Sequence, residues 1–229
     1  MKKIFKYIFA GMAAMSVVAC SEDALETSPS SSVSGNELLG TATNALVSLN
    51  GVYRAMYTAG VSNSSNTHQC FGITAYNLVA DVMGEDCIMN GQGSGWFWYD
   101  CVYNVKSRYT STGWRSYDMW NGYYTWISNV NYILAEEETM SGSETEKNYV
   151  LGQAYAVRAY SYFMLAQMFS RTYKGHESEP CVPLYTEPTD IATEGKGRAT
   201  VEEVYQQITS DLDKAITMLG NSGKRNISA

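Results

Sequence analysis

Histidine is the scarcest ionisable residue of this chain, and its scarcity limits the metal chemistry that the chain can support. The 229 residues include two histidines, His68 and His176, and each stands alone. No pair among the five cysteines has the C-x-x-C spacing of a zinc site. We therefore expect no metal site.

Motifs of enzymatic chemistry are also missing. The sequence contains no G-x-x-x-x-G-K-[ST], H-E-x-x-H or G-x-S-x-G pattern, and residues 81–86 lack the alternating acids of a calcium loop. A glycoside hydrolase would need two carboxylates about 5 to 10 Å apart. Nothing in the sequence pairs the candidates Asp81, Glu85, Asp86 and Asp100. We therefore expect a protein that is not an enzyme and holds no cofactor.

Basic residues are few, which argues against one class of partner. Sixteen Lys and Arg stand against twenty-three Asp and Glu, and the formal net charge is −7. A phosphate backbone is bound by a basic face. We therefore expect no nucleic acid partner.

Long apolar runs are scarce, and the clearest one lies at the N-terminus. Residues 8–19 follow three lysines and are too few for a permanent spanning helix, so residues 1–19 are predicted to be a secretory signal peptide. The run ends in VVAC, which resembles a bacterial lipobox with Cys20 as the lipid attachment site. The alternative is an ordinary signal peptide with an incidental cysteine.

The residues that follow Cys20 are acidic and then serine-rich. The sequence SEDALE resembles the tag that directs Bacteroidetes lipoproteins to the outer cell surface. Acyl chains on Cys20 would hold the protein to the outer membrane, facing the extracellular side. Residues 20–36 are predicted to be a flexible tether, and residues 37–229 the folded domain. Disulfides are permitted in that compartment, but the sequence leaves every pairing open among Cys70, Cys87, Cys101 and Cys181.

Apolar residues recur at helical spacing in five stretches, and no stretch alternates convincingly as a strand does. The predicted helices cover residues 37–58, 71–83, 120–134, 149–169 and 201–219. Thr200 and Glu203 form a capping box before the last helix, and Gly220 is expected to end it. The expected buried stripe of that helix consists of Val201, Val204, Tyr205, Ile208, Leu212, Ala215, Ile216 and Leu219.

The helix predicted over residues 149–169 is apolar on two faces and is therefore expected to be central. Arg158 lies within it, and a buried charge needs partners, so we expect a core ion pair rather than a catalytic role. Leu151 to Tyr155 matches half of the tetratricopeptide signature L-G-x-x-Y. The expected fold class is all-α, with tetratricopeptide-like helical hairpins and long irregular loops at residues 84–113 and 171–198.

Three segments together resemble one family. They are WNGYYTWISNVNYIL (120–134), GQAYAVRAYSYFMLAQMFS with VPLYTEPT (152–170 and 182–189), and RATVEEVYQQITSDLDKAI (198–216). Their order, their spacing and the lipobox resemble the SusD/RagB outer-membrane lipoproteins. The resemblance implies a SusD-like α/α superhelix. It also implies a surface binder of glycan or another nutrient, and a TonB-dependent SusC-like transporter as partner.

Two departures from the family pattern affect this expectation. The family's Gly-x-Pro-Leu is replaced by residues 180–184, Pro-Cys-Val-Pro-Leu. Members commonly run to about twice this length, so residues 37–229 resemble their N-terminal part. Much of the family's ligand surface comes from later loops, so ligand binding by this part alone is expected to be weak or absent. The alternative role is a helical scaffold that docks the transporter without touching ligand.

The candidate ligand site is the glycine-rich aromatic stretch GQGSGWFWYD, residues 91–100. Trp96 and Trp98 are predicted to stack on the C–H face of a sugar. The predicted polar partners are Tyr99, Asp100 and Asn104. The competing interpretation is that these rings fill a gap between helices or bury against further chain. Because consecutive rings point in different directions, one of Trp96 and Trp98 is expected to be buried.

Overall fold

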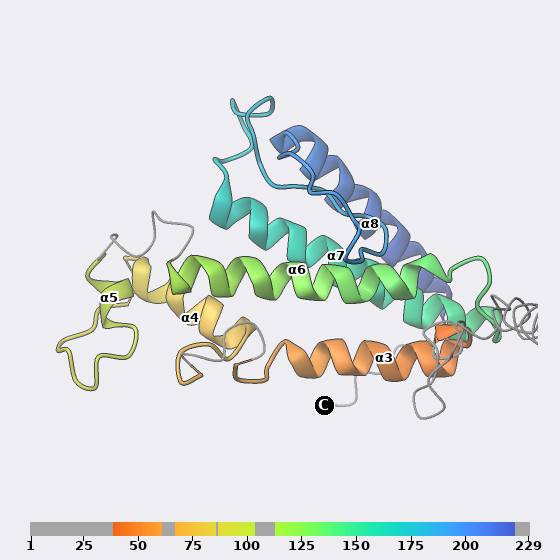
Figure 1. Cartoon of the computed structure of the whole chain (residues 1–229), viewed down its shortest axis with the longest axis horizontal. Helices are drawn as coiled ribbons and strands as arrows, with labels where there is room; N and C mark the ends of the chain where they lie inside the picture. The colour runs from red at the N-terminus through yellow and green to blue at the C-terminus, as the bar shows by residue number, and fades with distance from the viewer. Residues whose placement is uncertain (1–38, 61–66, 86, 104–112, 223–229) are drawn as a thin grey trace, which may run out of the picture. The chain divides into compact units, whose positions relative to one another are not determined.

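The computed structural model describes residues 39–60, 67–85, 87–103 and 113–222, and Cys20 lies outside these ranges. In the described ranges the regular elements are helices, with two isolated bridges and long irregular loops between them, which confirms the predicted fold class (Figure 1). The helices are α3 (Ala42–Ala55), α4 (Ile73–Met83), α5 (Trp98–Cys101), α6 (Trp114–Ala135), α7 (Glu144–Phe169) and α8 (Val201–Asn221). None of them has the length and apolar character needed to cross a bilayer.

Helix α7 is the centre of the fold. It contacts α3, α6 and α8, as its two apolar faces predict. In Figure 1, α6 and α7 run in opposite directions, and so do α7 and α8. The chain therefore forms two successive helical hairpins that share α7.

Capping boxes set the start of the two later long helices. Before α8, the Thr200 hydroxyl accepts from the Glu203 backbone N–H while the Glu203 carboxylate accepts from the Thr200 backbone N–H, as predicted. Ser143 and Glu146 form the same arrangement before α7, which begins five residues earlier than the predicted helix over residues 149–169. Each box satisfies amides that have no partner inside the helix.

The predicted buried stripe of α8 is partly wrong. Val201, Val204, Ile208 and Ala215 are buried, but Leu212 is 43% and Ile216 69% exposed. The buried side that faces α7 also contains an acid, Asp211. Gly220 does not end the helix, which continues to Asn221 and is capped at Ser222.

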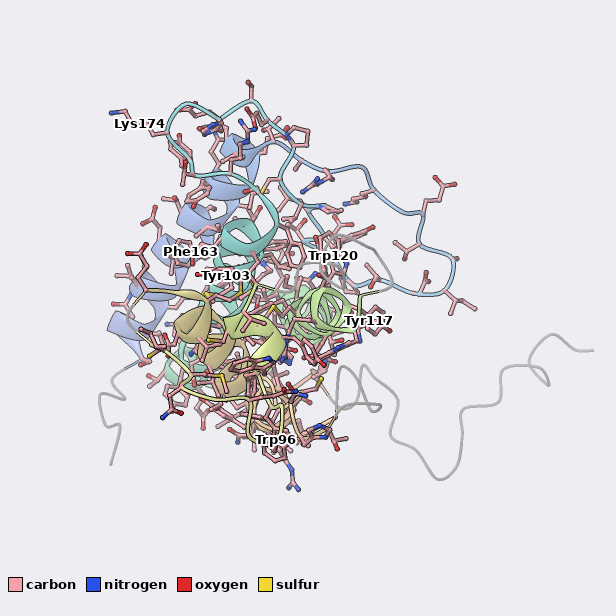
Figure 2. The ribbon with its side chains drawn as sticks, turned by 90° about the vertical axis from the view of Figure 1, so that its left-hand side faces the viewer. Trp96, Tyr103, Tyr117, Trp120, Phe163 and Lys174 are labelled. Carbon is pink, nitrogen blue, oxygen red and sulfur yellow. The ribbon has the colours of Figure 1, made fainter. Side chains whose placement is uncertain are left out.

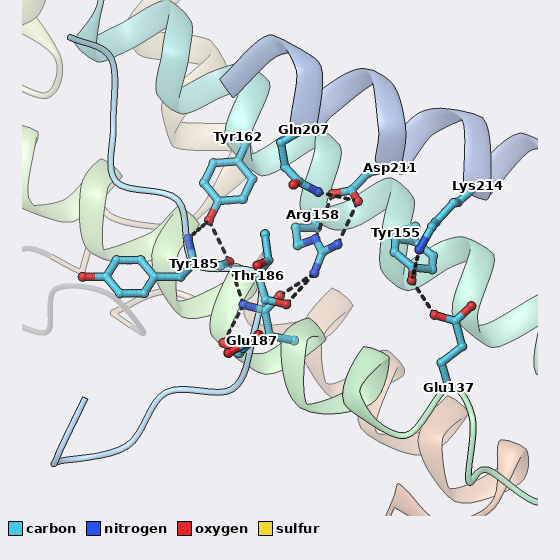
Figure 3. A network of polar contacts seen from close by, with 11 residues as sticks. Glu137, Tyr155, Arg158, Tyr162, Tyr185, Thr186, Glu187, Gln207, Asp211 and Lys214 are labelled. Carbon is cyan, nitrogen blue, oxygen red and sulfur yellow. Dashed lines mark hydrogen bonds and ion pairs between the residues drawn. The ribbon is translucent and has the colours of Figure 1, made fainter. Parts of the chain in front are cut away.

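Asp211 is buried because it pairs with Arg158, which confirms the expected core ion pair. The Arg158 guanidinium donates to both carboxylate oxygens of Asp211 at 2.8 Å. It also donates to Asn131 Oδ1 on α6, at 2.9 Å, and to the Thr186 carbonyl, at 3.1 Å. Figure 3 shows this network between the helices and the extended chain at residues 185–187. One buried cation thus connects α6, α7, α8 and the segment between α7 and α8.

An aromatic cluster joins α4 to α6. The rings of Tyr76, Tyr123 and Trp126 are fully buried, with centroids 4.9 to 6.0 Å apart. The Tyr76 hydroxyl donates to the Asp118 carbonyl at 3.0 Å and lies over Gly122, where an added Cβ would be 2.4 Å away. Glycine is needed here because α4 places a side chain directly against the backbone of α6.

Candidate functional site

The predicted ligand residues lie on the stretch that leads into α5 and continues just beyond it. Trp96 is 49% exposed, Tyr99 is 57% exposed, and Trp98 is partly buried. In Figure 2, Trp96 lies at one edge of the molecule, apart from Tyr103 and Trp120. Asn104 lies outside the described residues. The structure therefore brings an indole and a phenol to the surface of this loop.

The exposed Trp96 ring has a neighbour that the sequence did not identify. The His68 imidazole lies 5.1 Å from it between centroids, at an interplanar angle of 33°. His68 is itself exposed and belongs to the polar stretch before α4. Two flat rings from separate loops thus form one surface.

Phe97, rather than Trp96 or Trp98, is the buried ring of this stretch. It is 6% exposed and packs edge-on against Phe71, with centroids 6.1 Å apart. Its backbone is left-handed, with φ of 56°, a conformation that costs a bulky residue energy. Its N–H donates to Gln69 Oε1 at 2.9 Å, which helps to hold that conformation. Burying Phe97 turns Trp96 outward, and Trp98 is partly buried, so the fully buried ring expected at Trp96 or Trp98 is Phe97 instead.

A buried ion pair fixes α5 to the start of α6. Asp100 is 4% exposed, and its carboxylate accepts from the Arg115 guanidinium at 3.0 Å. Arg115 also donates to the Gln69 carbonyl at 2.8 Å and lies over the rings of Trp114 and Phe97, at 4.1 and 5.1 Å. This position of Asp100 supports the rings from within. Its predicted contact with a ligand stays a prediction.

Tyr103 is a further exposed ring just beyond α5, and it lies apart from Trp96 (Figure 2). It is 54% exposed, and its backbone is left-handed with φ of 52°. Its hydroxyl donates to the Met83 carbonyl at the end of α4. Tyr103, like His68, Gln69 and Arg115, was not among the predicted site residues. All four lie outside residues 91–100, and no local pattern in the sequence indicates their role.

The site offers no place for a metal ion among the residues described. No group of three or more His, Cys, Asp or Glu side chains gathers within those ranges in a way that could hold one. Cys70, Cys87, Cys101 and Cys181 are all present as thiols rather than disulfides. The arrangement can supply stacking rings and hydrogen bonds.

Comparison with known proteins identifies the same group that the sequence segments resemble. A SusD-like family, described as starch-binding and associating with the outer membrane, matches residues 89–228. A SusD-like carbohydrate binding protein from Bacteroides vulgatus is similar in structure, with 27% identity and a TM-score of 0.69 over 82% of this chain. No curated protein matches the chain.

Two further solved structures share the fold. A SusD superfamily protein from Bacteroides fragilis has 24% identity and a TM-score of 0.59, over 77% of this chain and 39% of its own. A laminarin binding SusD-like protein has 22% identity and a TM-score of 0.51, over 77% of this chain and 33% of its own. The B. vulgatus protein is matched over 37% of its length. The chain thus spans less than two fifths of each of these three structures.

Proposed function

Because the chain belongs to the SusD-like family of starch-binding proteins that associate with the outer membrane, we propose that it binds an extracellular glycan at the cell surface. In this proposal Cys20 carries the lipid anchor, and bound oligosaccharide is delivered to a TonB-dependent SusC-like transporter. The observation that carries the proposal is the exposed Trp96 ring on a stretch held from within by Asp100 and Arg115. A sugar presents a flat C–H face to such a ring, and binding requires no chemical step.

The rigid support of the ring favours binding over the alternative roles. An indole that is 49% exposed suits stacking on a sugar, and the titration with polysaccharides below separates this role from docking of the transporter. A glycoside hydrolase needs two available carboxylates, and that of Asp100 is buried against Arg115. Because the supporting residues are already in place, ligand binding would cost little ordering of the loop.

Binding is tested by isothermal titration calorimetry of the purified chain against starch, laminarin and a panel of other plant and host polysaccharides. Trp96→Ala is expected to weaken binding at least about tenfold, because an aromatic anchor contributes more than most contact residues. Trp98→Ala and Tyr99→Ala report how far the contact extends. Phe163→Ala is the matched control, since Phe163 is also exposed but lies on α7 (Figure 2). Equal affinity of Trp96→Ala and wild type would contradict the assignment of the site.

The anchor and the partner need separate measurements. Metabolic labelling with a fatty-acid analogue should mark the wild-type chain and leave Cys20→Ala unmarked; labelling that persists in the variant would refute the assignment of Cys20. Co-purification of a β-barrel transporter with the chain from detergent-solubilised outer membranes tests the partner. Recovery of the chain without any such barrel, under conditions that preserve membrane complexes, would contradict it.

A further inference from the structure

A cavity of about 320 Å³ lies between α6 and residues 183–193, and it shares no lining residue with the aromatic loop. On the α6 side it is lined by Trp120, Tyr124 and Ser128, which lie one and two turns apart on the same face of the helix. Small-molecule sites occupy roughly 300 to 1,000 Å³. We call this cavity the α6 pocket, and its size suits one small ligand.

The opposite wall of the α6 pocket is extended chain, with Tyr185, Thr189 and Asp190 among its lining residues. Tyr185 and Tyr124 meet edge to face, with centroids 6.1 Å apart, and Tyr124 also contacts Trp120 at 4.9 Å. Three aromatic rings thus stand in one connected group at the pocket. Such rings can cover the apolar face of a ligand that has hydroxyls at its edges.

The extended wall is held in place through its backbone. Tyr162 accepts from the Tyr185 N–H at 2.7 Å and donates to the Tyr185 carbonyl at 2.8 Å (Figure 3). Asn131 donates to the carbonyls of Tyr185 and Glu187, at 2.8 and 3.1 Å. Further along, the Tyr132 hydroxyl donates to the Thr189 carbonyl at 2.7 Å. These bonds use backbone groups and hold the side chains of Tyr185 and Thr189 at the pocket. The Tyr185 hydroxyl also accepts from the Lys196 N–H at 2.9 Å.

Hydroxyl and carboxylate oxygens supply the polar part of the lining. Ser128 Oγ and Thr189 Oγ1 lie 3.4 Å apart, from opposite walls. Asp190 accepts from the Thr193 hydroxyl and from the Ala192 N–H, both at 2.9 Å. These hydrogen bonds, that of Thr193 first, hold the pKa of the Asp190 carboxyl below its usual value, so it stays an ionised acceptor at neutral pH.

We propose that the α6 pocket is a second binding site, which takes one neutral sugar unit between its aromatic rings and the hydroxyls of Ser128 and Thr189. Neutral sugars are favoured because the charged residue among the described lining is the acid Asp190, which would repel a uronic or sulfated sugar. This inference rests on the proposed function, since it deepens glycan binding. It adds a site for a single sugar unit of the glycan, and this site is distinct from the exposed Trp96 ring.

The test uses saturation-transfer NMR on the full chain with glucose, galactose, mannose and N-acetylglucosamine as probes. The Trp96→Ala background removes the loop site while leaving the α6 pocket intact. On that background, Thr189→Val removes a hydroxyl at nearly constant shape, and about tenfold weaker binding is expected. Ser128→Leu projects a larger apolar side chain into the cavity and removes the Ser128 hydroxyl, and it should abolish binding. Thr217→Val is the control, because its hydroxyl is exposed on α8 and bonds its own helix.

The outcomes separate this inference from the proposed function. Sugar binding that survives Trp96→Ala, is weakened by Thr189→Val and is abolished by Ser128→Leu supports the α6 pocket. If the single variant Trp96→Ala already binds no sugar, the α6 pocket is not a second binding site, while the proposed function stands. Absence of any binding by the wild type, for the monosaccharides here and the polysaccharides above, overturns both. Circular dichroism verifies that each variant keeps its helices.

Discussion

Two buried arginines determine where the functional surfaces lie, and neither is available to a ligand. Arg115 is 3% and Arg158 5% exposed, and each pairs with an equally buried aspartate from a different helix. Arg115 holds the aromatic stretch, and Arg158 holds residues 185–187 through Thr186. A charge buried without its partner is strongly destabilising. These arginines therefore act on ligand binding by positioning other residues.

At the same scale, Cys70 is expected to be an inert thiol. It is fully buried, and burial together with the nearby Asp118 carboxylate raises its pKa from 9.0 to about 12. Below pH 9 the thiol is neutral in both folded and unfolded chains. Between pH 9 and 12 the unfolded chain ionises while the folded chain does not, so the stability contributed by the neutral thiol is lost as the pH rises.

Iodoacetamide labelling followed by mass spectrometry checks this expectation. At pH 8 the exposed Cys87 should be alkylated in the folded chain, and Cys70 only after unfolding in guanidinium. Urea unfolding at pH 8 and pH 10.5 provides the second measurement, and wild type should lose more stability than Cys70→Ala. Parallel losses in the two proteins would show that Cys70 does not titrate as expected.

At the scale of elements, α7 and α8 come close together at Gly152. A Cβ built on Gly152 would lie 2.8 Å from Leu219 Cγ and 3.1 Å from Met218 Cβ. This glycine belongs to the partial tetratricopeptide signature in the sequence. Its physical role here is to let the C-terminal turns of α8 approach the α7 backbone.

The close approach predicts opposite effects for the same substitution in two helices. Gly152→Ala should lower the free energy of unfolding by about 1 to 2 kcal/mol, because overpacking outweighs the gain in helix propensity. Gly51→Ala, in the exposed part of α3 with no atom within 4 Å of the added Cβ, should raise it by about 0.5 to 1 kcal/mol. Urea denaturation measures both values, and stabilisation by Gly152→Ala would contradict the described packing.

Periodicity predicted the elements better than it predicted which of their faces are buried. All five expected helices exist, although three start elsewhere: the first at Ala42 rather than residue 37, the third at Trp114 rather than residue 120, and the fourth at Glu144 rather than residue 149. In α8 the stripe failed at Leu212 and Ile216, because the buried face is rotated away from them and toward Asp211. An aspartate in a polar helix resembles a surface residue until its partner, Arg158, is known.

The candidate site was less accessible to sequence reasoning. A four-residue helix such as α5 carries no period, so residues 84–113 gave no indication of it. The exposure of Trp96 depends on the left-handed backbone at Phe97, and local rules do not predict that conformation for a phenylalanine. His68 and Gln69 contribute through tertiary contacts between two loops, and no local sequence pattern indicates such contacts.

At the scale of the folded domain, the Arg158 network connects more of the chain than any helix pair does. Asn131 belongs to α6, Arg158 to α7 and Asp211 to α8, and Thr186 lies in the segment that lines the α6 pocket. Tyr155 forms a second polar group nearby, donating to Glu137 at 2.5 Å and accepting from Lys214 at 2.9 Å (Figure 3). Stability and the shape of the pocket are therefore coupled through one buried side chain.

Removing the partner of Arg158 should consequently affect both properties. Asp211→Ala leaves a buried cation unpaired and should cost about 3 to 5 kcal/mol in urea unfolding. It should also speed tryptic cleavage after Lys196 and Arg198, because the segment loses part of its support. Arg171→Ala is the control, since its pair with Glu179 is exposed at 3.6 Å and should contribute less than about 1 kcal/mol. Equal stability of the two variants would contradict the coupling.

The anchoring of residues 185–187 divides the long connection between α7 and α8 into two shorter arcs, whose outer ends are joined where the Cys181 N–H donates to the Ala199 carbonyl. In the second arc, Glu194 and Gly195 are exposed, and an added Cβ at Gly195 would meet nothing within 4 Å. Once the ends of a loop are fixed, the entropic cost of closing it grows only with the logarithm of its length. The peptide bond between Glu194 and Gly195 is thus a place where an epitope tag or a fluorescent label can be inserted to follow the protein on living cells, with the helices left undisturbed.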